Sequence, residues 1–309
     1  EKGNALNAEA IQRQATAGLL YAVAAYTMWG IAPLYFKQIA SVPAPDILMH
    51  RIVWSAALLA LLLLGLVQFA KVRAIFRSKR LIGLLALASV LLGGNWLLFI
   101  WAINANMMLE ASLGYYINPL LNVFLARLFL NERLRNMQKA AVVLAIIGVA
   151  NIIIAHGTLP WVALLLAGSF AIYGLLRKQI PVEPLPGLFM ETLVLLPFAA
   201  LYWAYFASAE ANMLTNEWSL NAWLMAAGVV TTLPLLAFNA AAKRIMFTTL
   251  GLIQYIGPTL MFIFAVGMYD EPLEPARLVT FGFVWCGLVL FSLDSLKTYR
   301  QQRKVLRAA

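Results

Sequence analysis

The segment YYINPLLNVFLARLFLNERL, residues 115–134, is apolar enough to enter a bilayer, yet it carries polar groups at helical spacing. Tyr115, Asn118 and Asn122 fall at positions i, i+3 and i+7, so one face of a helix would present all three. Polar groups inside a membrane are costly and usually face a bundle interior or a wet cavity. This face is therefore predicted to line a solute cavity. Hydrogen bonding between helices, without a ligand, is the alternative.

Two basic groups near the start of the apolar segment 46–69 could contact a charged solute. Arg51 and His50 stand close to Lys37 at the end of the preceding segment, and the cluster could attract a carboxylate or another anionic group. Snorkelling to the headgroups would account for Lys37 alone. His50 titrates near neutrality when unperturbed, so it is a candidate proton carrier. A hydrogen-bonding or substrate-contacting role is the alternative for His50.

Glu191, at the start of the segment 186–206, is one of very few acids within the apolar segments. A carboxyl group there is a second candidate for proton coupling, and pairing with a basic group is the alternative. Arg127, near the end of its own segment, is expected to snorkel to the inner headgroups.

Aromatic residues near the middle of the segments suit a cavity for amphipathic or aromatic compounds, with packing in the core or against lipid as the alternative. Trp29 and Trp96 have this position, and Trp96 follows Asn95 in LLGGNWLLF, where glycines allow backbones to approach closely. The other residues predicted to line the cavity are Tyr35, Tyr173, Asn239, Gln254 and Tyr255.

These residues must be positioned by helices that cross a membrane. Of 309 residues, 63% are hydrophobic and 12% charged, which is far from the composition of a soluble domain. Apolar stretches long enough to span the hydrocarbon core recur along the chain. The sequence therefore predicts an all-α polytopic membrane protein with ten spans, at residues 17–36, 46–69, 81–103, 109–130, 137–155, 159–176, 186–206, 220–240, 247–269 and 276–296.

The charges orient these spans. Most of the 23 Lys and Arg residues fall in every second loop, Arg177, Lys178, Lys243 and Arg244 among them, and the positive-inside rule then places both termini in the cytoplasm. Residues 1–16 form a polar leader and residues 297–309 a basic tail. The leader has no apolar h-region, so we expect no cleavable signal peptide and expect the first span to direct insertion. The predicted location is the inner membrane of a bacterium.

Other classes of function lack their signals. The net charge of +10 is spread in short runs between apolar segments, which argues against nucleic-acid binding. The single cysteine, Cys286, excludes an internal disulfide and a cysteine cluster for a metal. No G-x-x-x-x-G-K-[ST] loop is present to bind ATP, and His50 and His156 stand far apart. We therefore expect no cofactor, no metal site and no enzymatic activity.

An internal repeat relates the two halves of the chain. A shift of 139 residues places the segment 115–134 over QYIGPTLMFIFAVGMYDEPL, residues 254–273, and aligns Pro119 with Pro258 and Glu132 with Glu271. A weaker echo aligns LMHRIV with FMETLV, and so His50 with Glu191. Residues 17–155 and 156–296 are thus predicted to be five-span repeats, inverted because five is odd. Inverted repeats are typical of transporters with a midplane site that opens alternately to the two faces.

The repeated residues suggest mechanical roles. Each proline removes one helical hydrogen bond and is predicted to kink its helix, so Pro119 and Pro258 are candidate gate hinges, with packing as the alternative. Glu132 and Glu271 would lie on opposite sides of the membrane, and each is predicted to cap the helix that follows it. Because Gly257 and Met261 replace the two asparagines in the second copy, the predicted site is asymmetric.

The stretches YTMWGIAPLYFK, LMHRIVWS and LGYYINPLLNVFLARLFLNERL resemble the EamA branch of the drug/metabolite transporter superfamily, and within it the RarD group. The resemblance covers about residues 17–296. It implies a ten-helix inner-membrane carrier that exports small metabolites or drugs, in a group linked by name to chloramphenicol. It also implies that spans 1 to 4 and 6 to 9 surround a central cavity.

The expected function is secondary active export of small amphipathic organic solutes, such as metabolites, amino-acid-like compounds or drugs, by alternating access, with proton exchange as one option. An uncoupled lipid or solute flippase, or a membrane interaction subunit that transports nothing, is the alternative. The expected partners are a small-molecule substrate and membrane lipid. Monomeric and dimeric states are both open.

Overall fold

The structure is a computed structural model that describes residues 2–105, 108–157, 160–269 and 275–308, and these residues form helices and loops with no strand. Helices suit an apolar chain in lipid because they satisfy their own backbone groups. The elements are α1 (Lys2–Gln38), α2 (Ala44–Gly65), α3 (Phe69–Phe76), α4 (Lys79–Asn104), α5 (Met108–Phe129), α6 (Asn136–His156), α7 (Trp161–Gln179), α8 (Pro184–Phe206), η1 (Ala209–Ala211), α9 (Trp218–Arg244), α10 (Phe247–Ile253), α11 (Ile256–Tyr269) and α12 (Pro275–Ala308).

The class of fold predicted from composition is confirmed. In the described part of the chain, nine helical stretches are long and apolar enough to cross a membrane, counting α10 and α11 as one stretch. The predicted span 109–130 falls on α5, outside these nine, so the count of ten stays a prediction. The predicted polar leader and basic tail continue α1 and α12 as helix.

Two predicted spans differ from the helices that form. The span 46–69 is too long, because α2 ends at Gly65 and Val67 turns the chain with a φ of 53° before the short α3. The span 247–269 is interrupted at Gln254 and Tyr255, between α10 and α11. Pro258 has no N–H for the carbonyl of Gln254, which accounts for a break at this point. By contrast, α5 runs as one helix through Pro119, and the hinge role of both prolines stays a prediction.

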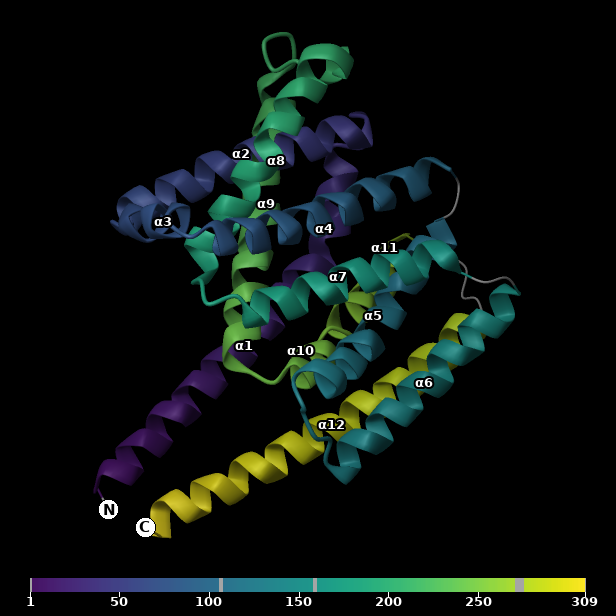
Figure 1. The fold of residues 1–309 in the computed structure, drawn as a ribbon. Helices are drawn as coiled ribbons and strands as arrows, with labels where there is room; N and C mark the ends of the chain where they lie inside the picture. The colour runs from purple at the N-terminus through teal and green to yellow at the C-terminus, as the bar shows by residue number, and fades with distance from the viewer. Residues whose placement is uncertain (1, 106–107, 158–159, 270–274, 309) are drawn as a thin grey trace.

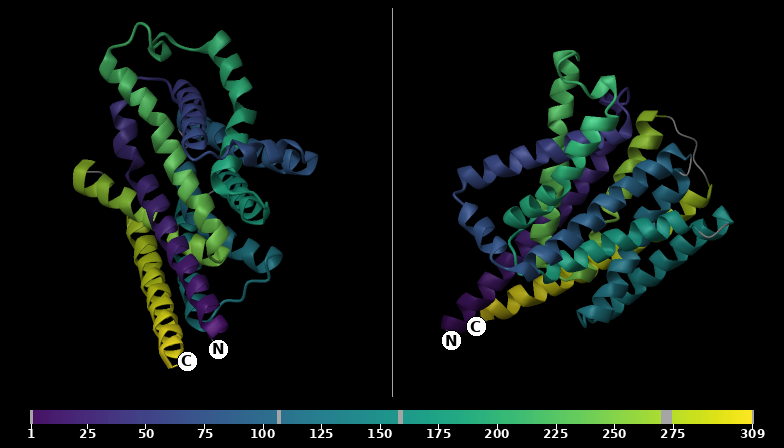
Figure 2. Two further views of the ribbon diagram at one scale, coloured as in Figure 1. Left: turned by 90° about the vertical axis from the view of Figure 1, so that its left-hand side faces the viewer. Right: turned by 45° about the horizontal axis from the view of Figure 1, so that its top comes forward.

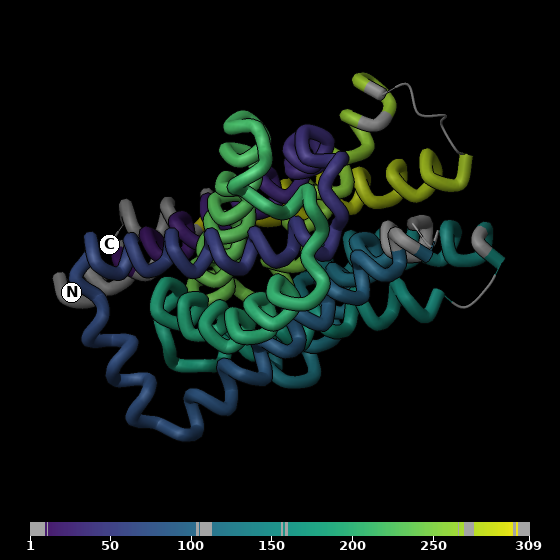
Figure 3. The backbone as a smooth tube through the Cα atoms, turned by 90° about the horizontal axis from the view of Figure 1, so that it is seen from above, coloured from purple at the N-terminus to yellow at the C-terminus, as the bar shows by residue number. Residues whose placement is uncertain are grey.

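The N-terminal part (α1–α6) and the C-terminal part (α7–α12) are interleaved. Figure 1 shows α12 lying along α6 at one edge of the bundle, while α1 packs along α9 and α5 along α7. The segment from α2 through α3 to α4 projects sideways as an angular hairpin (Figure 3). The two termini lie close together in both views of Figure 2. An even number of membrane crossings would place both termini on the same side of the membrane, in agreement with this arrangement.

Small residues bring α6 and α12 into close contact. A Cβ added at Gly148 would lie 3.0 Å from the carbonyl oxygen of Thr280, and one added at Gly287 would lie 2.9 Å from that of Ala141. Glycine is therefore needed at both positions for the backbones to approach. The predicted repeat equates these two glycines, and the structure places both of them in one interface.

Glu132 caps a helix, but not the one predicted. Its Oε1 accepts a hydrogen bond of 2.7 Å from the backbone N–H of Phe247, and its Oε2 accepts one of 2.9 Å from Thr248, both at the start of α10. At the start of the following helix, α6, Gln138 accepts from the Arg135 N–H instead. A left-handed turn at Asn131, with a φ of 52°, precedes Glu132. The prediction that Glu132 caps the helix following it is therefore wrong. Glu271, for which the same was predicted, lies outside the described residues.

Replacing Glu132 by alanine should destabilise the protein by roughly 1–2 kcal/mol, because the first N–H groups of α10 lose their acceptor. The measurement is the midpoint of thermal unfolding in detergent. Glu183→Ala is the matched control, because Glu183 forms only an exposed ion pair with Lys71 at 2.6 Å and should cost under about 1 kcal/mol. Equal shifts of the unfolding midpoint for the two variants would show that the Glu132 cap contributes no more to stability than the exposed ion pair.

Candidate functional site

A pocket lies at the junction of four helices, α2 and α4 from the N-terminal part and α8 and α9 from the C-terminal part. In this conformation its free space is narrow, about 10 Å³, which is room for about one water molecule. Leucines form much of its wall, with hydroxyl groups and two charged side chains among them, which is typical of a site for an amphipathic ligand. The lining residues are Arg51, Ile52, Ser55, Leu92, Trp96, Leu188, Glu191, Thr192, Leu195, Thr231, Thr232 and Leu235.

Arg51 reaches this pocket from α2 and is held there by two other helices. Its Nε donates a hydrogen bond of 2.8 Å to the hydroxyl of Thr231 on α9. Its guanidinium lies 4.6 Å from the ring centre of Trp96 on α4, a cation–π contact. Burial between Trp96 and Thr231 fixes the position of the charge within the membrane.

The structure separates His50 from Arg51, although the two are neighbours in sequence. The Nε2 of His50 lies 3.1 Å from the carbonyl oxygen of Ala211, and its ring meets the edge of Trp203 at 5.0 Å. Successive residues of a helix point about 100° apart, so His50 does not line the pocket that Arg51 lines. The expected cluster of the two side chains does not form.

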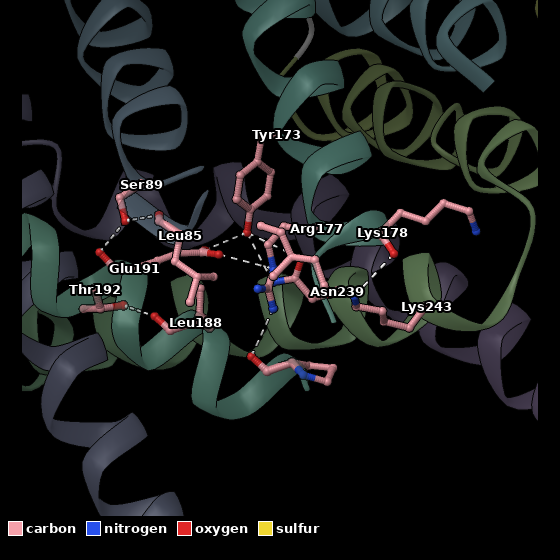
Figure 4. A network of polar contacts seen from close by, with 12 residues as sticks. Leu85, Ser89, Tyr173, Arg177, Lys178, Leu188, Glu191, Thr192, Asn239 and Lys243 are labelled. Carbon is pink, nitrogen blue, oxygen red and sulfur yellow. Dashed lines mark hydrogen bonds and ion pairs between the residues drawn. The ribbon is translucent and has the colours of Figure 1, made fainter. Parts of the chain in front are cut away.

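Glu191 lines the same pocket from α8 and takes part in a buried polar network (Figure 4). Its Oε1 lies 3.2 Å from the Nε of Arg177, and the two side chains are only 1% and 0% exposed. Its Oε2 accepts a hydrogen bond of 3.1 Å from the Tyr173 hydroxyl, which in turn accepts one of 3.2 Å from Asn239. Of the two sequence-based readings of Glu191, this conformation shows the ion pair.

Arg177 is not the loop charge that the positive-inside pattern predicts. It lies on α7, wholly buried, with its Nη2 within 3.4 Å of the carbonyl oxygen of Pro184. Gly187 on α8 makes room for it, because a Cβ at that position would overlap the guanidinium. The sequence places Arg177 at the loop end of an apolar segment and so predicts a topology signal, but the helix buries it.

The lysines next to it hold helix ends together. Lys178 on α7 donates to the carbonyl oxygens of Ala242 and Ile245, at 2.9 and 2.5 Å, at the end of α9. Lys243 on α9 donates to the carbonyl oxygens of Lys178 and Ile180 at the end of α7. Each ammonium group thus meets the negative end of the other helix dipole. We call these two residues the lysine clamp.

The asparagines of α5 form a seam between helices and do not line the pocket. Asn118 donates to the carbonyl oxygen of Ala167 on α7 at 2.7 Å, and Asn122 donates to Asn118 and to Gln254, both at 3.2 Å. Both are nearly inaccessible, and none of these residues lines the pocket. The cavity prediction for this face is therefore not met here. The alternative, hydrogen bonding between helices, describes these contacts.

The remaining aromatic and amide candidates mainly stabilise helix packing. Tyr255 donates from its hydroxyl to the carbonyl oxygen of Tyr116 at 3.1 Å, and Tyr35 donates to that of Trp223 at 2.7 Å. Asn95 donates to the carbonyl oxygen of Leu166 at 2.8 Å.

A ring cluster beside the pocket contains Tyr26, Trp29, Phe170, Tyr173 and Phe238. Tyr115 lies outside the asparagine seam, with its ring 6.3 Å from that of Phe99. Of the predicted aromatic residues, Trp96 is the one that lines the pocket.

Sequence reasoning missed several functional candidates. The hydroxyl groups of Ser55, Thr192, Thr231 and Thr232 line the pocket, and the adjacent threonines in an apolar segment were the signal that could have found them. Asp46 is also buried, at 1% exposure, and neither of its carboxylate oxygens has a hydrogen-bond partner among the described residues. Its position one turn before His50 on α2 was the available signal.

Comparison with known proteins agrees with this architecture. Residues 16–154 match the EamA-like transporter family. An uncharacterized transporter of Vibrio cholerae is 52% identical over 95% of this chain and 97% of its own length. Protein RarD of Salmonella typhi is also 52% identical, over 94% and 99% respectively. A crystal structure with 17% sequence identity superposes with a TM-score of 0.70, covering 92% of this chain and 99% of that one.

The fold, the buried pocket and these relatives define a multi-pass membrane transporter of the EamA type. Within that family, the chain belongs to the RarD group.

Breaking the buried pair should be costly. Glu191→Gln or Arg177→Met alone should destabilise the protein by roughly 3–5 kcal/mol, because the remaining group stays buried without a full partner. The double variant should lose clearly less than the sum of the two. Thermal unfolding in detergent of the four proteins of this cycle measures the coupling.

The exposed pair of Lys71 and Glu183 serves as the control cycle, with an expected coupling below about 1 kcal/mol. Additive effects of Glu191→Gln and Arg177→Met would contradict the ion pair in the folded protein.

Proposed function

We propose that this protein is a secondary transporter that exports small amphipathic organic solutes across the inner membrane of a bacterium, and that the pocket between α2, α4, α8 and α9 binds the solute. The observation that carries the proposal is the pocket itself. Both parts of the chain line it, and it holds a charged residue from each, Arg51 and Glu191. Charged groups inside a membrane protein commonly mark a substrate or ion pathway.

Alternating access is the mechanism that this arrangement favours. A site between two parts of a chain can open to either face when one part rocks against the other. Tyr255 donates to the carbonyl oxygen of Tyr116, and the predicted repeat equates these two residues. Contact between equivalent residues is expected beside a pseudo-two-fold axis, which supports the proposal of inverted repeats.

The contacts at helix ends are suited to act as a gate. Glu132 joins the α5–α6 loop of the N-terminal part to α10 of the C-terminal part, while the lysine clamp joins α7 and α9 within the C-terminal part. These polar contacts are few and directional, so a second conformation can exchange them for contacts with water at small cost. Opening of this end is therefore proposed to separate Glu132 from α10, with the lysine clamp keeping α7 and α9 together.

Proton exchange through Glu191 is proposed to couple export to the proton gradient. Glu191 borders the pocket and its charge is held by Arg177 and Tyr173. Uptake of a proton would remove the charge that binds Arg177 and so would loosen this network. Solute binding and protonation would then act on the same group of side chains.

Flux assays in proteoliposomes test the function. We expect efflux of at least one compound from a panel of amphenicols, aromatic amino acids, amphipathic amines and amphipathic carboxylates, and faster efflux with an imposed pH gradient. The Glu191→Gln/Arg177→Met double variant, which avoids an unpaired charge, should transport without dependence on the gradient. Equal wild-type flux with and without a gradient would favour an uncoupled flippase, and no flux of any compound would count against transport.

Cysteine labelling tests the orientation. After replacement of Cys286 by serine, single cysteines at exposed positions in the loop 207–217 should react with an impermeant maleimide added to whole cells. Cysteines in α3, residues 69–76, should react only after permeabilisation. The reason is that the loop 207–217 is predicted to lie outside the cell and α3 to lie in the cytoplasm. The reverse pattern would overturn the proposed orientation.

A further inference from the structure

The pocket contains one charge that the protein itself balances. Glu191 is held at 3.2 Å by Arg177 and accepts a hydrogen bond from Tyr173. Figure 4 shows these groups converging on the carboxylate from α7. The positive charge of Arg177 cancels the negative charge of Glu191, so this corner of the pocket contributes no net charge to a solute.

The other charge in the pocket is not balanced in this way. Arg51 uses its Nε for Thr231 and lies over the ring of Trp96. Among the described residues, no carboxylate forms an ion pair with Arg51. Within the same residues, Nη1 and Nη2 of Arg51 donate no hydrogen bond. The side chain borders the pocket, so these two nitrogens are available to a solute. The charges of Arg51, Glu191 and Arg177 therefore sum to one positive charge.

This sum discriminates between classes of solute. Arg51 would repel a cationic solute. The ammonium group of a zwitterion would need the carboxylate of Glu191 as its partner, but that carboxylate is already paired with Arg177. An anion would supply the missing countercharge in a site of low dielectric constant, where it has most effect. The planar guanidinium matches a carboxylate with two parallel hydrogen bonds.

The composition of the rest of the wall suits an apolar body on the same solute, which the pocket would admit on widening from this narrow conformation. Trp96 covers one face of the guanidinium, and leucines from α4, α8 and α9 line the space around it. Thr192, whose hydroxyl donates to the carbonyl oxygen of Leu188 at 2.8 Å, and Thr232 line the side of the C-terminal part. One end of the pocket is thus cationic and most of the remainder is apolar.

We propose that the transported solute is an amphipathic organic monoanion, whose carboxylate binds the free edge of Arg51 and whose apolar part lies against Trp96 and the leucines. This inference rests on the proposed function, because it names the solute class of the same pocket. It selects anions over the neutral, zwitterionic and cationic compounds that the fold alone would admit.

Binding of a matched pair of probes tests the inference. Indole-3-acetate and indole-3-acetamide have nearly the same shape and differ in charge, and tryptamine supplies the cation. Titration of the purified protein in detergent should show the carboxylate binding about 10- to 100-fold more tightly than the amide, the range expected for a hydrogen-bonded charge pair. Tryptamine should bind more weakly than either.

Arg51→Gln should lower the affinity for the carboxylate by about 10- to 100-fold and change that for the amide little, because the amide does not need the charge. Retained binding of the amide also reports that the variant is folded. Arg127→Gln is the matched control, since it removes an exposed arginine outside the pocket and should leave both affinities unchanged.

The outcomes separate this inference from the proposed function. A wild-type protein that binds the amide as well as the carboxylate, or that binds neither probe, overturns the anion inference without any variant. So does an Arg51→Gln protein with undiminished affinity for the carboxylate. In each case, gradient-dependent flux of a neutral or cationic compound would leave the transport proposal standing, whereas absence of all flux would end both.

Discussion

The ion pair between Arg177 and Glu191 is the interaction on which the electrostatics of the site depend. A charge moved out of water costs several kcal/mol unless a partner with good geometry repays it. Here Arg177 on α7 lies at ion-pair distance from the carboxylate of Glu191 on α8, although its Nε and the Glu191 Oε1 form no hydrogen bond among the described residues. Tyr173, held by Asn239 on α9, donates a hydrogen bond to the other carboxylate oxygen. The pair fixes three helices of the C-terminal part around the pocket. It also removes Glu191 from the charge balance, so that Arg51 alone determines the sign of the site.

Other charged residues act at helix ends, where backbone groups lack partners of their own. Glu132 binds the first N–H groups of α10, and the lysine clamp binds the last carbonyls of α7 and α9. In each case a residue of one helix or loop completes a helix that is distant in sequence. The lysine clamp lies within the C-terminal part, whereas Glu132 joins the two parts, and the same helix ends also pack in the apolar core through residues such as Ile245 and Phe247.

The sequence predicted the elements well because a single physical quantity, the length of apolar runs, decides them. It predicted the site less well because helical spacing identifies a face but not where that face points. The face of Asn118 and Asn122 is polar as predicted, yet it meets α7 and Gln254 and not the pocket. Arg177 looked like a loop charge, since nothing local shows that Gly187 opens a space for it on α8. Arg51 was correctly predicted to contact the pocket, because a charged side chain among apolar residues of a membrane segment is energetically costly and commonly marks a functional site.

The asymmetry of the site therefore has a different origin from the one that the missing asparagines suggested. In the weaker echo of the repeat, His50 aligns with Glu191, and Arg51 aligns with Thr192. On α8 both Glu191 and Thr192 line the pocket, whereas on α2 Arg51 lines it and His50 turns towards Ala211. The two helices that the predicted repeat equates thus present one charge of each sign, from positions one residue apart. Because only the acid has an oppositely charged partner, the two parts of the chain enclose a pocket that is electrically one-sided.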